Sequence, residues 1–92
     1  MENSSIHLII EGRVQGVGFR YHTQMKALEL GVKGWVKNRS DGKVEVIAEG
    51  EASILRAFTD WCYEGPRYSE VTKITESSRV YGNEYDSFNI VF

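Results

Sequence analysis

Two short segments of the chain carry groups suited to phosphate chemistry. The first is the segment 12–20, Gly-Arg-Val-Gln-Gly-Val-Gly-Phe-Arg, which has three glycines in its first seven residues and ends at Arg20. Glycines let main-chain N–H groups converge without obstruction by a Cβ atom, and a planar guanidinium can bind two phosphoryl oxygens at once. The segment therefore fits an anion-binding loop, although a glycine-rich turn with a solvent-exposed arginine fits its composition equally well.

The second candidate is Asn38, which ends a β-rich run just before the turn residues Asp41-Gly42. An asparagine in this place commonly serves the turn itself, because its side chain hydrogen-bonds to nearby main-chain groups. The same amide is also able to orient a water molecule beside a bound phosphoryl group. Both interpretations remain open on this segment alone.

Other kinds of site do not fit the residues present. No Gly-Lys-Ser/Thr follows the loop, as a Walker A motif requires, and Gly12, Gly16 and Gly18 do not match the GxGxxG spacing of dinucleotide-binding folds. No Ser, Cys or Asp stands where it would be an activated nucleophile, and neither His7 nor His22 has a second metal ligand at a suitable spacing. We therefore expect no metal, no cofactor and no covalent intermediate.

The elements that must position these groups follow from the periodicity of the chain. Strands are predicted over 6–11, where Gly12 ends the strand, over 32–38, 43–49 and 71–80, and at the alternating residues 88, 90 and 92. Helices are predicted over 21–30 and 52–63. The turn residues 39–42 join two of the strands into a hairpin. The order is βαββαβ plus a short C-terminal strand, which predicts an α+β, ferredoxin-like split βαβ two-layer sandwich with two helices on one face of the sheet.

Each predicted helix has an expected buried face. In the first helix Tyr21, Met25 and Leu28 recur at helical spacing, and Gly31 stands where a left-handed C-terminal cap would fall. In the second helix one apolar stripe contains Ile54, Leu55, Phe58, Trp61 and Cys62. The single cysteine lies within that stripe and beside no histidine, so we interpret it as a buried structural thiol.

This topology predicts that both candidate segments lie on one rim of the sheet. In a split βαβ unit the first two strands run parallel with one strand between them, so their C-terminal ends share an edge. Two strand spacings amount to about 10 Å, a gap that a phosphate and one water molecule would fill. We therefore expect the glycine-rich loop and Asn38 to lie on opposite sides of a phosphate site.

Bulk composition restricts the partners and the location of the protein. The 92 residues fit one domain spanning 1–92, and the 11 basic and 13 acidic side chains leave a net charge of −2 without any run of like charge. This balance argues against a nucleic-acid or membrane-surface partner. The first apolar run is too short for a signal peptide or a membrane span. We expect a cytoplasmic monomer that acts on a small molecule.

Taken together, the two segments resemble the acylphosphatase family. The loop 12–20 is similar to the signature loop of that family, and Gly34-Trp35-Val36-Lys37-Asn38 with Asp41-Gly42 is similar to its second motif. The resemblance extends over nearly the whole chain and is weakest over 82–86 and the terminal strand. It implies a hydrolase that cleaves the carboxyl–phosphate bond of acyl phosphates without a metal, giving a carboxylate and inorganic phosphate.

The resemblance also implies roles for individual residues. Arg20 would bind the phosphoryl group and Asn38 would position the attacking water, and these two form the expected catalytic pair. The expected phosphate-binding residues are Gln15, Gly16, Val17, Gly18, Phe19 and Arg20. Inorganic phosphate, as the product, should occupy the same loop and inhibit.

Two other classes of function use the same fold. A ligand-sensing domain would bind an anion in the loop without turnover. An RNA-binding module would use Trp35 as an exposed aromatic platform on the open face of the sheet. The next strand disfavours the RNA-binding module, because it lacks the aromatic pattern of such modules and places Glu45 and Glu49 near any bound backbone.

Overall fold

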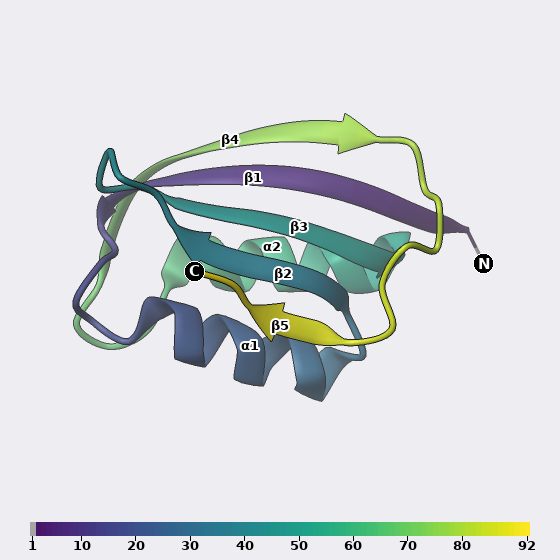
Figure 1. Cartoon of the computed structure of the whole chain (residues 1–92), viewed down its shortest axis with the longest axis horizontal. Helices are drawn as coiled ribbons and strands as arrows, with labels where there is room; N and C mark the ends of the chain where they lie inside the picture. The colour runs from purple at the N-terminus through teal and green to yellow at the C-terminus, as the bar shows by residue number, and fades with distance from the viewer. Residues whose placement is uncertain (1) are drawn as a thin grey trace.

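The computed structural model describes residues 2–92 and shows two helices packed against one face of a five-stranded sheet (Figure 1). Met1, the first residue of the predicted domain, lies outside the described residues. The elements are β1 (Asn3–Arg13), α1 (Phe19–Leu30), β2 (Lys33–Asn38), β3 (Val44–Glu51), α2 (Ala52–Glu64), β4 (Glu70–Arg79) and β5 (Phe88–Ile90). The predicted α+β sandwich of ferredoxin-like type is confirmed.

The strands lie in the order β4-β1-β3-β2-β5, and three of them, β1, β2 and β5, run in the same direction. β3 pairs antiparallel with both β1 and β2, so β1 and β2 run parallel with β3 between them, as predicted. β5 pairs parallel with β2, a partner that the alternation of residues 88–92 could not indicate. The C-terminal ends of β1, β2 and β5 therefore lie at one rim of the sheet, on the left in Figure 1.

The core lies between the helices and the sheet. Alternate residues of the three central strands face the helices and are fully buried: Leu8, Ile10, Val36, Val44, Val46 and Ala48. The predicted stripe of α2 is confirmed, because Leu55, Phe58 and Cys62 are buried and Ile54 and Trp61 pack at the margin of the core. Trp35 alternates with buried Val36 and so lies on the face of the sheet away from the helices.

The predicted buried face of α1 is wrong. Tyr21, Met25 and Leu28 are 56%, 51% and 58% exposed, whereas Phe19, Thr23 and Ala27 are the residues buried against the sheet. The helix begins at Phe19, two residues before the predicted start, and its buried residues Phe19, Thr23 and Ala27 follow one another at intervals of four along one face. The large apolar side chains are consequently turned toward solvent.

The predicted ends of the elements hold well. Gly31 closes α1 in the left-handed conformation, with φ 76° and ψ 23°, and Gly65 ends α2. β1 runs one residue past its predicted end at Gly12 and reaches Arg13, after a β-bulge between Glu11 and Gly12. Residues 39–42 form the predicted turn between β2 and β3.

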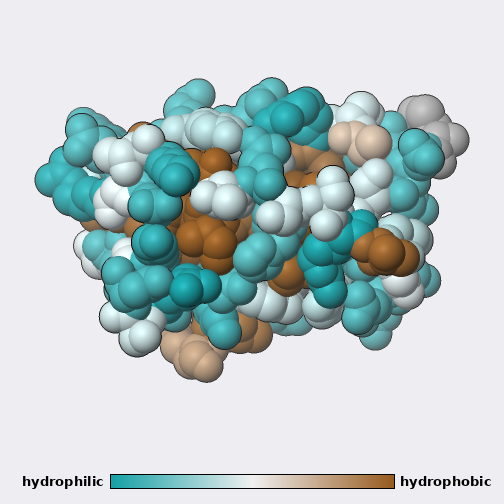
Figure 2. Space-filling model, turned by 90° about the horizontal axis from the view of Figure 1, so that it is seen from above, coloured by the Kyte–Doolittle hydropathy of each residue, from teal (hydrophilic) through white to brown (hydrophobic). Residues whose placement is uncertain are grey.

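The surface is mixed in character. Seen from above, it is mainly hydrophilic, with an apolar patch near the middle of the view (Figure 2). Among residues 2–92, no helix has both the length and the apolar character needed to cross a membrane.

Candidate active site

The connection from β1 to α1 is a glycine-rich loop fixed at both ends by buried side chains. Val14 and Phe19 are each 1% exposed, whereas Gly16 and Gly18 between them lie at the surface. Both glycines adopt φ values near 75° (76° and 74°), a left-handed conformation that other L-residues rarely adopt. The buried side chains of Val14 and Phe19 therefore hold the two ends of the loop, and the exposed glycines between them allow its left-handed turns.

Helix α1 begins directly at the end of the loop and has no side-chain cap. Gly18 is the N-cap residue, and the first turn contains no acidic side chain. The first N–H groups of an α-helix lack partners within the helix and carry partial positive charge. The start of α1, with Arg20 in its first turn, is therefore well placed to bind an anion.

Arg20 and Asn38 line the same cavity, which has a volume of about 190 Å³ and lies at the rim where β1, β2 and β5 end. Its lining residues come from the loop, α1, β2 and the C-terminal segment: Val14, Gly16, Gly18, Phe19, Arg20, Tyr21, Asn38, Ile90 and Phe92. The structure thus brings the glycine-rich loop and Asn38 together around one hollow of a size suited to a small substrate.

Within residues 2–92, the side chain of Asn38 forms no hydrogen bond with the turn that follows it. The Arg39 N–H donates to the Lys43 carbonyl at 2.8 Å, and the Lys43 N–H donates to Asp41 Oδ1 at 3.1 Å. The side-chain oxygen of Asn38 is buried and accepts no hydrogen bond from the described residues. A buried acceptor without a partner costs about 1–3 kcal/mol, so this one is suited to a water or ligand donor.

The turn after Asn38 is held by its own charges. Arg39 Nε donates to both carboxylate oxygens of Asp41, at 3.2 and 3.1 Å. This hydrogen bond, with that from the Lys43 N–H, lowers the pKa of Asp41, and the same contact raises the pKa of Arg39. Asp41 therefore stays ionised well into the acid range and keeps its bond to the main chain of the turn.

Arg20 forms no ion pair with the described residues. Its guanidinium carbon lies over the ring of Phe92, 5.2 Å from the ring centroid. An aromatic ring attracts a cation without neutralising it. The positive charge of Arg20 therefore remains available to an anion in the cavity.

The side chains of three of the expected phosphate-binding residues make contacts elsewhere in the fold. Gln15 Nε2 donates to the carbonyls of Arg39 and Lys43, at 2.8 and 2.9 Å. Val17 packs against the hydrophobic core, and the ring of Phe19 lies 6.0 Å from that of Trp61. Contact between these residues and a phosphate would therefore involve main-chain groups.

The cysteine and the histidines lie in surroundings that fit structural roles. Burial raises the pKa of the Cys62 thiol, which is therefore protonated at neutral pH and a poor nucleophile. His7 Nε2 lies 2.7 Å from Glu45 Oε2, and the ring of His22 packs edge-on against that of Tyr21. Within residues 2–92, no three His, Cys, Asp or Glu side chains are grouped so that they could hold a metal ion.

Outside the glycine-rich loop 12–20, sequence reasoning missed three residues of the cavity wall. Tyr21 follows Arg20 directly, so its place in the first turn of α1 was a usable signal. Ile90 and Phe92 carried none, because they reach the cavity only through the parallel pairing of β5 with β2.

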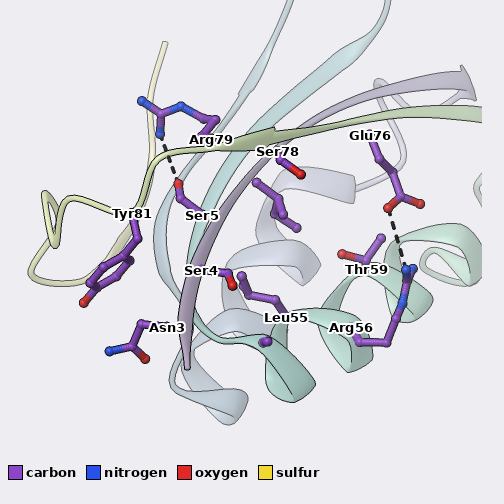
Figure 3. Close-up of a pocket in the computed structure, with 12 residues that line it drawn as sticks. Asn3, Ser4, Ser5, Leu55, Arg56, Thr59, Glu76, Ser78, Arg79 and Tyr81 are labelled. Atoms are coloured by element: carbon purple, nitrogen blue, oxygen red, sulfur yellow. Dashed lines mark hydrogen bonds and ion pairs between the residues drawn. The ribbon is translucent and has the colours of Figure 1, made fainter. Parts of the chain in front are cut away.

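A second and larger cavity, of about 300 Å³, lies at the opposite end of the sheet between α2, β1 and β4 (Figure 3). Arg56 is paired with Asp60 at 3.1 Å and with Glu76 at 3.7 Å. Arg79 lies 3.6 Å from Glu84 and donates to Ser5 Oγ at 3.3 Å. Both arginines have acidic partners, so this cavity is the weaker candidate for an anion site despite its size.

Known proteins resemble this chain over nearly its whole length. A family model described as Acylphosphatase matches residues 6–90. A curated acylphosphatase of Bacillus velezensis is 49% identical over 88 residues, covering 94% of this chain and 96% of the relative. One of Pelotomaculum thermopropionicum is 39% identical over 92 residues, covering both chains fully.

The fold has a solved counterpart as well. The crystal structure of acylphosphatase from Bacillus subtilis superposes with a TM-score of 0.93 at 42% identity, covering 97% of this chain and 99% of that one. The match therefore includes both the glycine-rich loop and the strand that ends at Asn38. Since sequence and fold agree over this extent, the chain belongs to the acylphosphatase family.

Proposed function

We propose that this chain hydrolyses acyl phosphates to a carboxylate and inorganic phosphate, with Arg20 and Asn38 as its catalytic residues. One observation carries the assignment of roles: Arg20, which forms no ion pair within residues 2–92, and Asn38, whose side-chain oxygen accepts no hydrogen bond from those residues, line one cavity. The first suits the phosphoryl group and the second suits a water molecule. The proposed enzyme is a single-domain cytoplasmic monomer that acts on a small molecule, with no nucleic-acid or membrane partner.

The phosphoryl group binds at the start of α1. Main-chain N–H groups of the loop 15–19 and of the first turn would donate to its oxygens, and the guanidinium of Arg20 would bind two of them. These groups are fixed before the substrate arrives, because the loop is anchored by Val14 and Phe19. Preorganised donors stabilise the charge that develops on phosphoryl oxygens as the bond to the leaving group stretches.

Asn38 then orients the nucleophile. A water molecule that donates a hydrogen bond to Asn38 Oδ1 has its lone pair free to attack phosphorus opposite the leaving oxygen. The bond from water oxygen to phosphorus forms while the bond from phosphorus to the acyl oxygen breaks. The electron pair leaves with the carboxylate, and the water proton passes to a phosphate oxygen or to solvent.

The chemistry of the leaving group explains why so few side chains suffice. A carboxylate is a stable anion at neutral pH and leaves without protonation. General-acid catalysis, which often contributes about 10²–10⁴ in rate, is therefore not required. Positioning and electrostatic stabilisation remain, and the loop, Arg20 and Asn38 supply both.

The sharpest test of this function follows benzoyl phosphate in ¹⁸O-labelled water. Equimolar benzoate and inorganic phosphate should form, with the label in phosphate, because the proposed attack is at phosphorus. Addition of a chelator should leave the rate unchanged, since every proposed contact to the phosphoryl group comes from the protein. Phosphate binding without product formation would instead identify an anion-sensing domain, and label in benzoate would show attack at the carbonyl carbon.

A further inference from the structure

The side chain of Gln15 joins the two halves of the proposed site. Its Nε2 donates one hydrogen bond to the Arg39 carbonyl at 2.8 Å and another to the Lys43 carbonyl at 2.9 Å. Gln15 belongs to the glycine-rich loop, whereas the two carbonyls belong to the turn that follows Asn38 and to the residue after it. Both N–H groups of the amide are thus committed to the hairpin.

The two acceptors are the residues that close the turn. The Arg39 N–H itself donates to the Lys43 carbonyl, so Gln15 binds the two residues whose hydrogen bond closes the turn. Arg39 is also the residue directly after Asn38. A contact there controls where the last residue of β2 stands relative to the loop.

The sheet alone does not hold these two segments in register. β1 and β2 are not neighbours, because β3 lies between them. The loop 14–18 lies beyond the end of β1, and the turn lies beyond the end of β2. Hydrogen bonds of the sheet therefore fix the strands, whereas Gln15 connects the two extensions directly.

We propose that Gln15 is a positioning residue, which sets the distance between the phosphoryl group bound by the loop and the water oriented by Asn38. This inference rests on the proposed function. Its consequence is specific: loss of the Gln15 amide should impair the attack of water while leaving the phosphate-binding groups of the loop in place. A misplacement of about 1 Å between reacting groups can cost up to about a hundredfold in rate.

The test compares Gln15→Met with Gln24→Met. Methionine keeps a similar length and removes the donors. Gln24 is the matched control, because its Nε2 also donates to a distant carbonyl, that of Phe88 at 3.0 Å, but it connects α1 with β5. For Gln15→Met we expect kcat to fall about tenfold or more, with the inhibition constant of inorganic phosphate changed by less than about twofold. Gln24→Met should keep more than half of the wild-type kcat at a similar denaturation midpoint.

Two further measurements separate positioning from a general structural role. In the Asn38→Ala background, Gln15→Met should lower kcat by less than about twofold, because residues that act through each other are not additive. Amide hydrogen exchange of residues 39–43 should become faster in Gln15→Met and not in Gln24→Met. The exchange measurement tests the contact without reference to activity.

Each outcome decides one question. If Asn38→Ala keeps the wild-type kcat, the proposed role of Asn38 is refuted. This result does not depend on whether Gln15→Met is impaired, so it tests the proposed function separately from the role of Gln15. Gln15→Met with more than half of wild-type kcat, equal losses in both backgrounds, or unchanged hairpin exchange would overturn the positioning role. A parallel loss of phosphate affinity would place Gln15 in phosphate binding instead.

Discussion

The two ends of the sheet both present arginines to a cavity, yet only one end is suited to an anion. At the far end, Arg56 and Arg79 are paired with Asp60, Glu76 and Glu84, and the cavity is the larger of the two, at about 300 Å³. At the rim that holds Asn38, the cavity measures about 190 Å³, and among residues 2–92 its arginine has an aromatic ring for a neighbour and no ion pair. In this comparison, the groups without partners, and not the cavity volume, favour the rim that holds Asn38 as the anion site. A buried acceptor left without a partner is costly, and a bound ligand can satisfy it, whereas an arginine without an acidic partner keeps its charge available to an anion.

The largest effect that this comparison predicts is the loss of activity in Arg20→Lys. A flexible ammonium does not reproduce a bidentate guanidinium, so kcat/KM should fall by about 10²–10³ while the protein stays folded. Phosphate should also bind more weakly. Arg56→Lys is the matched change at the far end and should keep activity within about twofold, since exposed ion pairs contribute little. Steady-state kinetics and circular dichroism check both variants, and equal losses would erase the distinction between the two arginines.

The second effect concerns Asn38→Ala, compared with Asn3→Ala in the wall of the far cavity. If Asn38 orients water, kcat should fall at least about a hundredfold with little change in phosphate affinity. Stability should change little, because Asp41 rather than Asn38 bonds to the main chain of the turn. Asn3→Ala should leave kcat within about twofold. An Asn38→Ala protein that is destabilised but retains more than a tenth of wild-type kcat would show that Asn38 stabilises the turn and does not orient water.

A third effect is stabilisation by phosphate. Inorganic phosphate should inhibit competitively, because product and substrate occupy the same loop. At a hundred times its dissociation constant it should raise the free energy of unfolding by about 2.7 kcal/mol. Chemical denaturation with and without phosphate measures this gain. The gain should be much smaller in Arg20→Lys and unchanged in Arg56→Lys; an equal loss in both variants would mean that phosphate binds at the far end as well.

The smallest effect is expected for Phe92→Ala. The ring lies over Arg20 at the surface, where a cation–π contact contributes about 0.5–1 kcal/mol. Phosphate affinity should therefore fall about two- to fivefold, with kcat nearly unchanged. Phe92→Tyr keeps an aromatic ring and should restore the affinity. Isothermal titration with phosphate checks both, and unchanged affinity in Phe92→Ala would show that Arg20 holds its position without the ring.

The sequence predicted those parts of the fold that depend on local pattern. The hairpin followed from turn residues between two alternating runs, and the stripe of α2 followed from a strong helical period. The face of α1 was predicted wrongly, since the large side chains Tyr21, Met25 and Leu28 defined a stripe whereas the helix buries Phe19, Thr23 and Ala27. The size and hydrophobicity of side chains alone do not reveal which face of a helix packs against the sheet.

In the candidate site, too, some residues could be predicted from local pattern and others could not. The glycine-rich loop and Asn38 were recognisable because their residue types and their place at strand ends limit what they can do. The contacts of Gln15 with the hairpin and of Phe92 with Arg20 join segments far apart in the chain, so no local pattern signals them. They depend on strand order and on the parallel pairing of β5.

The closeness of the C-terminal residue to Arg20 has a practical consequence for anyone who purifies or labels this protein. An affinity tag or fluorophore attached after Phe92 would start at the wall of the cavity that Arg20 and Asn38 line, where it would compete with a ligand of that cavity for space. The beginning of β1 lies at the opposite end of the sheet (Figure 1), so a tag attached there would stay clear of the chemistry. Activities compared between preparations tagged at different ends would then differ for reasons unrelated to the catalytic residues.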